Sequence, residues 1–387
     1  MNKKLNFTQE QVTKILENIA EEKDGYNKVM QIAMEALMRA EREEFNNENR
    51  DVSNGYRPRR FFGKGKELVL SVPRSRHHKF YPILLSVLKE EDREAKELAF
   101  YLYGAGLTTG QVGELFDKIY GKHYSTSQIS RMFDFAREEV QAWLERPLLS
   151  YYPIIYIDAV FISVRRGDSV IKEAFYTILG VRPDRTREVL SVVNKPGESA
   201  RGWNSVFKKL RERGVQEIGL VISDALNGIE DAVAGVFSCS HQFCTVHLER
   251  NVLKEIRKKD KSEISEELQE VFNPNNPSDT VETAWNRWKV FIEKHQNKYP
   301  ALKKMLTERY RLYFTYFKYD YRIRSMLYTT NWIERLNRDY RRVTRMRGAL
   351  PNVDAVLLLL GHVAMYKKAY LRKIPKLNYE KSFRWED

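Results

Sequence analysis

A single carboxylate lies in the middle of a strongly apolar stretch. Residues 154–164 are mostly apolar and β-branched, as is typical of a buried strand, and Asp158 is their only charged residue. An ionised carboxylate in such a run is costly unless it is paired, hydrogen-bonded or bound to a cation. The flanking residues offer no adjacent cationic partner, so we expect Asp158 to bind a metal ion.

A second carboxylate, Asp224, follows a similar apolar run. Around the two acids, the hydrophobic pattern and turn residues predict three strands, a helix and a fourth strand, at residues 154–164, 170–180, 188–194, 199–213 and 217–223. Three meandering strands followed by a helix and a parallel strand open a ribonuclease-H-like sheet, whose first and fourth strands are neighbours. We therefore expect Asp158 and Asp224 to lie close together.

A third carboxylate begins a row of arginines within residues 328–345. Helical spacing marks a buried face made of Ile333, Leu336, Tyr340 and Val343. An adjoining stripe of the same helix carries an acid and three cations, Glu334, Arg338, Arg341 and Arg345. This arrangement suits a metal site that opens onto a phosphate backbone. A salt-bridged surface helix is the alternative interpretation.

Four soft or borderline metal ligands occur within nine residues, after a helix predicted at 227–237: Cys239, His241, Cys244 and His247. They fall where a short strand is predicted to run into a helix. Strand geometry would send Cys244 to the face opposite Cys239 and His241, which is poor for one tetrahedral zinc site. A buried cysteine beside a positioned histidine is the favoured interpretation, and structural zinc is the alternative.

The bulk composition indicates the partner and the compartment. The 387 residues carry a net charge of +14, spread along the chain, which favours a polyanionic partner. Two cysteines argue against a disulfide-stapled secreted protein. No long apolar segment or signal-like N-terminus is evident, so we expect a cytoplasmic protein without a membrane partner.

The N-terminal part divides into a helix and a basic connection. Residues 8–45 are predicted to be helical, and their apolar stripes favour packing on the protein's own core, with a dimerisation arm as the alternative. Residues 46–79 are basic and rich in turns. They fit either a solvated linker with a short strand at 68–72 or an arm that contacts DNA phosphates. The arm would use Arg57, Arg59, Arg60, Arg74 and Arg76.

Residues 92–146 are predicted to form three helices, the second beginning at Thr108 and the third at Ser125. Tandem short helices resemble a helix-turn-helix, and the basic chain favours that interpretation over an ordinary packing module. The helix entering a major groove would offer Thr126, Ser127, Gln128 and Arg131. Residues 254–322 are predicted to be helical, with aromatic rings that face the core or stack on unpaired bases.

Taken together, these landmarks resemble a known family. Asp158, Asp224, the Cys244-Thr-Val-His247 motif, a helical insertion and the Thr330-Asn-Trp-Ile-Glu334-Arg-Leu-Asn337 motif occur in the order seen in bacterial Mutator-type insertion-sequence transposases of the DDE superfamily. The resemblance covers residues 54–361. It implies an α/β fold: a ribonuclease-H-like catalytic core, a mixed five-stranded sheet with flanking helices, interrupted by an all-helical insertion and preceded by helical DNA-binding domains.

The resemblance also implies an activity. Asp158, Asp224 and Glu334 would be the catalytic acids and would bind two Mg²⁺ ions, with Mn²⁺ as a substitute, while Cys244, His247 and Asn331 would be accessory residues. Such an enzyme binds double-stranded DNA, both the terminal inverted repeats of its element and the target, and acts as a homodimer associated with the nucleoid. It cleaves DNA and transfers a 3′-hydroxyl to another strand by a copy-out, paste-in route.

The domain boundaries follow from both lines of argument. We expect an N-terminal arm, a basic linker and arm, a helix-turn-helix-like domain, the first part of the catalytic core, the helical insertion and the rest of the core, at residues 1–50, 51–91, 92–147, 148–253, 254–322 and 323–387. Two alternatives remain open: a ribonuclease-H-like nuclease or resolvase that does not join strands, and a non-catalytic regulator derived from a transposase.

Overall fold

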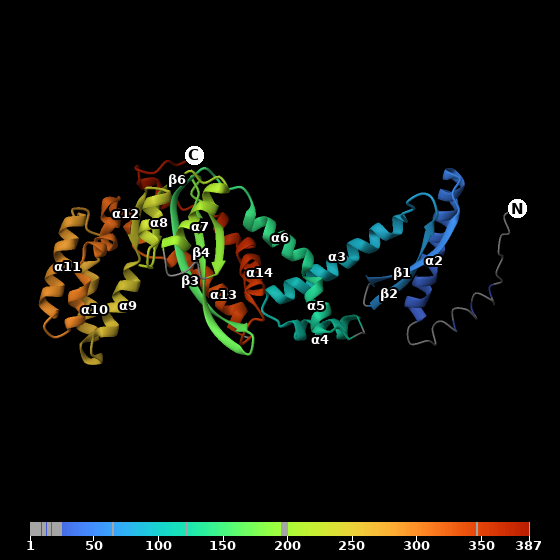
Figure 1. Cartoon of the computed structure of the whole chain (residues 1–387), viewed down its shortest axis with the longest axis horizontal. Helices are drawn as coiled ribbons and strands as arrows, with labels where there is room; N and C mark the ends of the chain where they lie inside the picture. The colour runs from blue at the N-terminus through green and yellow to red at the C-terminus, as the bar shows by residue number, and fades with distance from the viewer. Residues whose placement is uncertain are drawn as a thin grey trace. The chain divides into compact units, whose positions relative to one another are not determined.

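The computed structural model describes residues 9, 13, 17, 25–63, 66–120, 123–194, 200–345 and 347–386. The chain divides into two compact units, residues 1–136 and 137–387. Figure 1 colours the elements in chain order. No helix in the described part of the chain is long and apolar enough to cross a membrane.

The first unit begins with a helix against a β-hairpin. The helix α2 (Gly25–Asn49) corresponds to the C-terminal part of the predicted helix 8–45, and most of residues 8–24 lies outside the described residues. The strands β1 (Ser53–Gly63) and β2 (Lys66–Ser75) pair antiparallel, and their apolar residues share a core with α2 and the next helix. The prediction of a linker with one short strand is therefore wrong here, because the arginines in β1 hide its strand pattern.

Four helices follow, where three were predicted: α3 (Ile83–Gly104), α4 (Thr109–Tyr120), α5 (Thr126–Met132) and α6 (Asp134–Glu145). The predicted third helix is interrupted at Phe133. The predicted helix starts at Thr108 and Ser125 each carry a capping box, with Gln111 on the Thr108 backbone and Gln128 on the Ser125 backbone. Ile119, near the C-terminal end of α4, is 41% exposed.

The second unit is organised around a five-stranded mixed sheet. In chain order its elements are β3 (Tyr151–Arg166), β4 (Ser169–Val181), β5 (Arg187–Asn194), α7 (Ala200–Glu212), β6 (Glu217–Ser223), α8 (Ile229–Val236) and β7 (Ser240–Phe243). The strand order is β5-β4-β3-β6-β7, with β3 parallel to β6 and antiparallel to β4. The prediction that the first and fourth strands are neighbours is confirmed.

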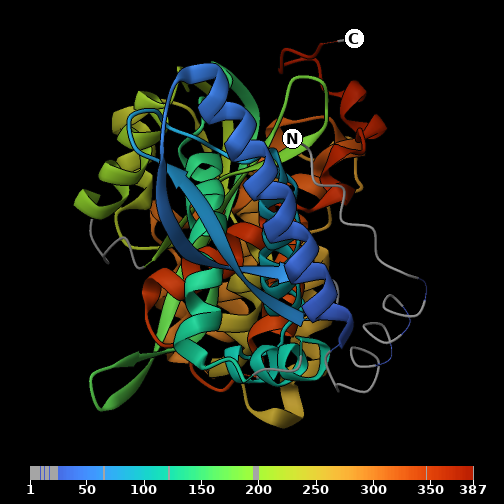
Figure 2. The ribbon, with the colours of Figure 1, turned by 90° about the vertical axis from the view of Figure 1, so that its right-hand side faces the viewer.

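Two strands continue beyond the sheet. The β6 partners of β3 end at Ile157, and the β5 partners of β4 end at Phe175, which faces Val160, so residues 161–174 form a two-stranded ribbon. The ribbon projects from the sheet in both Figure 1 and Figure 2. Leu350 forms a parallel bridge with Val164 along its edge.

The described residues between β7 and α13 form helices and turns without a strand. These helices are α9 (Thr245–Glu255), η1 (Lys258–Asp260), α10 (Lys261–Val271), α11 (Val281–His295), η2 (Pro300–Met305), η3 (Glu308–Lys318) and α12 (Tyr321–Leu327). Trp285, Trp288 and Phe291 are at most 5% exposed, so these rings face the core as the first alternative predicted. The chain continues with α13 (Asn331–Arg345), α14 (Val353–Met365), η4 (Lys368–Leu371) and η5 (Pro375–Tyr379).

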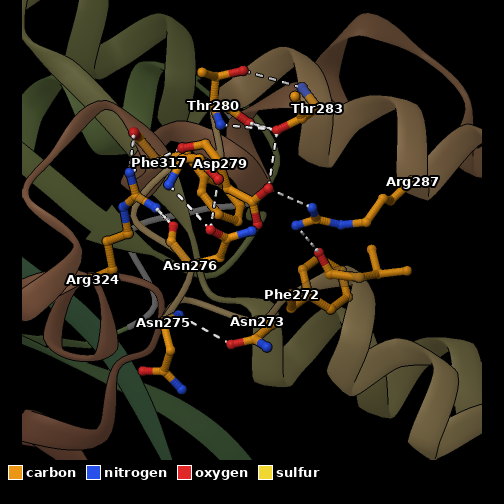
Figure 3. Close-up of polar contacts among 12 residues, drawn as sticks. Phe272, Asn273, Asn275, Asn276, Asp279, Thr280, Thr283, Arg287, Phe317 and Arg324 are labelled. Atoms are coloured by element: carbon orange, nitrogen blue, oxygen red, sulfur yellow. Dashed lines mark hydrogen bonds and ion pairs between the residues drawn. The ribbon is translucent and has the colours of Figure 1, made fainter.

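One buried arginine joins two parts of this helical region, the loop before α11 and the end of η3. Arg324 of α12 is 5% exposed and donates to four backbone carbonyls, those of Asn276, Asp279, Phe317 and Tyr319, at 2.8–3.1 Å. Figure 3 shows its guanidinium among these loops, near the capping residues of α11. A buried guanidinium with satisfied donors fixes the loops that it joins, since its removal takes a charged donor away from four carbonyls at once.

We predict that Arg324→Met destabilises the protein by about 3–5 kcal/mol, because the carbonyls lose a buried charged donor. In a thermal melt this corresponds to a drop of about 10 °C. The control is Arg322→Met, which removes an exposed ion pair with Asp320 and should cost less than about 1 kcal/mol. Equal melting temperatures for the two variants would contradict the role assigned to Arg324.

Candidate active site

The first two acids lie on neighbouring parallel strands. Ile157 of β3 is the register partner of Ser223 of β6, so Asp158 and Asp224 each follow a paired residue. Asp158 is 9% exposed. Burial, and then the negative charge of Asp224, raise the pKa of Asp158 to about 7 although His247, the Ala159 amide and Arg341 oppose the rise. Among the described residues, no cationic side chain forms a hydrogen bond or ion pair with Asp158, so the two carboxylates are held near each other without one.

A residue that the sequence analysis did not assign to the site contacts Asp158 directly. The Asn337 side chain on α13 is 1% exposed, and its Nδ2 donates to Asp158 Oδ2 at 2.8 Å. Its Oδ1 is buried and has no hydrogen-bond partner among the described residues. The signal in the sequence was its spacing, three residues after Glu334 within the same motif. Asn337 is therefore suited to hold one carboxylate oxygen of Asp158 in place.

The third acid lies on the helix that carries Asn337. The helix α13 packs against β3, and its predicted apolar face is buried. Glu334 is half-buried and precedes Asn337 by three positions, so the two side chains lie on one side of the helix. Asn331 is exposed at the start of α13. Glu334 is thus on the same helix and face as the residue that contacts Asp158.

Asp224 is surrounded by the Cys244 and His247 side chains. Ligand atoms of these three residues all lie within 4.8 Å of one another, the one such cluster found among the described residues. His247 Nδ1 forms an ion pair with Asp224 Oδ1. Burial lowers the pKa of His247, but hydrogen bonds to Asp224 and Cys244 outweigh it and raise the pKa to about 10. The raised pKa favours the charged imidazolium, which pairs with the Asp224 carboxylate.

The four residues considered for zinc do not form one site. His241 is buried, and its Nε2 lies 2.9 Å from the Ser223 hydroxyl. Cys244 and His247 instead belong to the cluster around Asp224, which includes neither His241 nor Cys239. The geometry matches the favoured interpretation, a buried cysteine with a positioned histidine.

A series of hydrogen bonds connects the strand that ends before Asp224 to the beginning of α13. The Cys244 amide donates to the Ser223 carbonyl at 2.8 Å. The next residue, Thr245, donates its amide and its hydroxyl to the Tyr328 carbonyl at 2.9 and 3.0 Å. The Thr330 hydroxyl lies 3.6 Å from Cys244 Sγ. These contacts fix the start of the helix that bears Glu334 relative to the strand that ends at Asp224.

The donor set around Asp158 fits a hard divalent cation. Its carboxylate is buried beside a second carboxylate, and the raised pKa of Asp158 reflects an unfavourable charge that a cation would offset. Carboxylate oxygens with room for water are the ligands that Mg²⁺ and Mn²⁺ prefer. The residues present therefore fit the predicted ions.

The predicted DNA-contacting residues differ in whether their side chains are exposed and already hydrogen-bonded within the protein. All five arginines of the hairpin are exposed, and Arg338, Arg341 and Arg345 are exposed on α13. Thr126, Ser127 and Arg131 are exposed on α5. The Gln128 side-chain oxygen accepts from the Ser125 amide at 2.8 Å, so it is already used by the helix cap. Only the amide nitrogen of Gln128 could then donate to a base.

We predict a pH-dependent stabilisation by Asp158→Asn. The pKa of Asp158 in the folded protein lies above its ordinary 3.8, so ionisation opposes folding; the penalty grows from about pH 4 and is complete above about pH 7. The substitution removes the charge and keeps an oxygen that can accept from Asn337.

In buffer with a chelator, the melting temperature of this variant should exceed that of the wild type, and by more at about pH 8 than at about pH 5. The control Asp231→Asn, at an exposed position on α8, should show no such trend. A variant destabilised equally at both pH values would contradict the prediction.

Comparisons with known proteins show which proteins this chain is similar to. A family model described as "Transposase, Mutator family" matches residues 4–372. A transposase for insertion sequence element IS905 of Lactococcus lactis is 28% identical over 78% of this chain and 76% of its own. A probable insertion-sequence transposase of Corynebacterium diphtheriae is 31% identical over 75% and 84% of the two chains. The transposase of IS256 in transposon Tn4001 of Staphylococcus aureus is 28% identical over 88% of this chain and 87% of its own.

Proposed function

The chain belongs to the Mutator family of transposases, and we propose that it cleaves DNA at the terminal inverted repeats of an insertion sequence and joins the freed 3′-hydroxyl to another strand. The observation that carries the proposal is the pair Asp158 and Asp224 on neighbouring strands, with Glu334 on the helix that contacts Asp158. The similar proteins named as insertion-sequence transposases support the same class of reaction.

The fold supports a ribonuclease-H-like catalytic core in this proposal. The sheet order β5-β4-β3-β6-β7 is the one expected of such a core. The core would comprise residues 148–253 and 323–387, with residues 254–322 as a helical insertion. Residues 92–147 would bind DNA as a helix-turn-helix, and the β1–β2 hairpin would bind it as a basic arm.

The three acids Asp158, Asp224 and Glu334 would hold two Mg²⁺ ions, or Mn²⁺ in their place. When bound, such ions activate the attacking oxygen and stabilise the leaving oxygen of an in-line displacement at phosphorus. The protein's own contribution is to hold the acids in place. Asn337 fixes one oxygen of Asp158, and the His247 imidazolium fixes Asp224.

The remaining site residues would bind the DNA backbone. Arg338, Arg341 and Arg345 continue from Glu334 along one exposed stripe and would neutralise phosphates next to the scissile bond. The nucleophile is water in the cleavage step and the freed 3′-hydroxyl in the joining step, so no covalent enzyme intermediate is needed. An element has two ends that are processed together, which favours a homodimer. The copy-out, paste-in route is proposed from the resemblance to the family.

We predict that Asp224→Asn and Glu334→Gln each abolish cleavage and joining while DNA binding is retained, because each removes a cation ligand and leaves the basic surfaces intact. The assay uses labelled duplexes carrying the ends of the protein's own element with Mg²⁺, and Asp231→Asn is the control. Cleavage without joining by the wild type would identify a nuclease, and binding without cleavage a regulator.

A separate prediction concerns sequence recognition by α5. Arg131→Ala should reduce the discrimination between terminal and random DNA by about 1–3 kcal/mol for the lost base contact. The control Lys118→Ala, a cation on α4, should weaken binding to both DNAs about equally. If Arg131→Ala also weakens both equally, Arg131 binds phosphate and the recognition surface lies elsewhere.

A further inference from the structure

Near the sheet, the ribbon of residues 161–174 has one buried face and one exposed face. The cross-strand pair Ile162–Glu173 and the adjoining pair Val160–Phe175 at the base of the ribbon belong to the first face, and all four residues are at most 8% exposed. The alternating residues between them form the second face, which we call the outer face: Phe161, Ser163, Arg165, Val170, Lys172 and Ala174. The ribbon therefore presents a separate surface on the strand that carries Asp158.

The outer face combines exposed apolar side chains with unpaired cations. Phe161 is 62% and Val170 58% exposed. Arg165 and Lys172 are exposed, and neither side chain has a hydrogen bond or ion pair among the described residues. By contrast, Arg166 on the other face is held by Glu173, with contacts of 2.7 and 3.1 Å. The outer face itself contains no carboxylate.

We propose that the outer face of the ribbon is a DNA-binding surface, with Arg165 and Lys172 on phosphates and Phe161 against the floor or wall of a groove. The proposal rests on the proposed function. It adds a DNA-binding surface that is separate from the catalytic acids, from the arginines of α13 and from α5. Unpaired cations without a neighbouring acid are complementary to phosphates.

The shape of the ribbon agrees with this partner. A major groove about 12 Å wide admits a two-stranded ribbon. Phe161 and Arg165 are separated by four residues of one strand, which is roughly 14 Å at about 3.4 Å per residue. The face can thus contact a groove and the phosphates that border it.

A second copy of the chain is the less suitable occupant. In a two-fold contact the same surface meets itself, so Arg165 and Lys172 of both copies would be brought together with no acid on either face. Like charges in such a contact oppose association. The charge pattern therefore favours nucleic acid.

The test compares two double variants with the same change of charge. Arg165→Gln with Lys172→Gln alters the outer face, and Lys258→Gln with Lys259→Gln alters exposed cations on η1. Binding to a fluorescent duplex of random sequence is measured over a series of salt concentrations. The ribbon variant should bind about tenfold more weakly or worse, and its slope of log affinity against log salt should fall by about 1.8. The η1 variant should bind nearly as the wild type does.

Phe161→Ser separates the apolar contact from the charges: affinity should fall while the salt slope stays unchanged. Wild-type affinity and slope in both ribbon variants would overturn the proposal, and an altered sedimentation coefficient with unchanged DNA binding would assign the face to a second copy. The proposed function is tested separately, by cleavage on saturating DNA. A wild type that neither binds nor cleaves DNA contradicts the proposed function, whereas a wild type that does both, with ribbon variants that bind equally well, contradicts only the role of the ribbon.

Discussion

The repulsion between two carboxylates on neighbouring strands is the constraint on which the second unit depends. The parallel pairing of β3 with β6 brings Asp158 and Asp224 together, and burial makes the charge on Asp158 more costly. Each acid has its own support. Asn337 donates to Asp158, and His247 pairs with Asp224. The two acids thus have different partners, and neither partner removes the repulsion between the two carboxylates. A bound cation would offset that repulsion.

The surrounding structure links the third acid to this pair. Hydrogen bonds from Thr245 to the Tyr328 carbonyl join the beginning of α9 to the loop before α13, so the strand that ends at Asp224 and the helix that bears Glu334 are connected directly. Within the helical region between them, Arg324 binds carbonyls of the loop before α11 and of η3. A long insertion can thus separate Asp224 from Glu334 in the sequence without loosening the site.

Much of this arrangement could be predicted from the sequence, because strands and amphipathic helices follow simple periodicities. The five predicted strand and helix positions around Asp158 agree with the structure to within about three residues, and the four apolar residues of the buried face of α13 were predicted correctly. The β1 strand was missed because arginines occupy positions that alternation would leave apolar. Asn337 was missed because a buried amide has no periodic signal; its role depends on a contact with a residue far away in sequence.

The most direct test of the account is the proton release that accompanies cation binding. Asp158, with a pKa of about 7, is largely protonated near pH 6 and must lose its proton to bind a divalent ion. Calorimetric titration of the protein with Mn²⁺, in buffers of different ionisation enthalpy, measures this release. The account predicts release approaching one proton near pH 6 and falling towards zero at about pH 9. Binding without proton release near pH 6, or no binding at either pH, would contradict it.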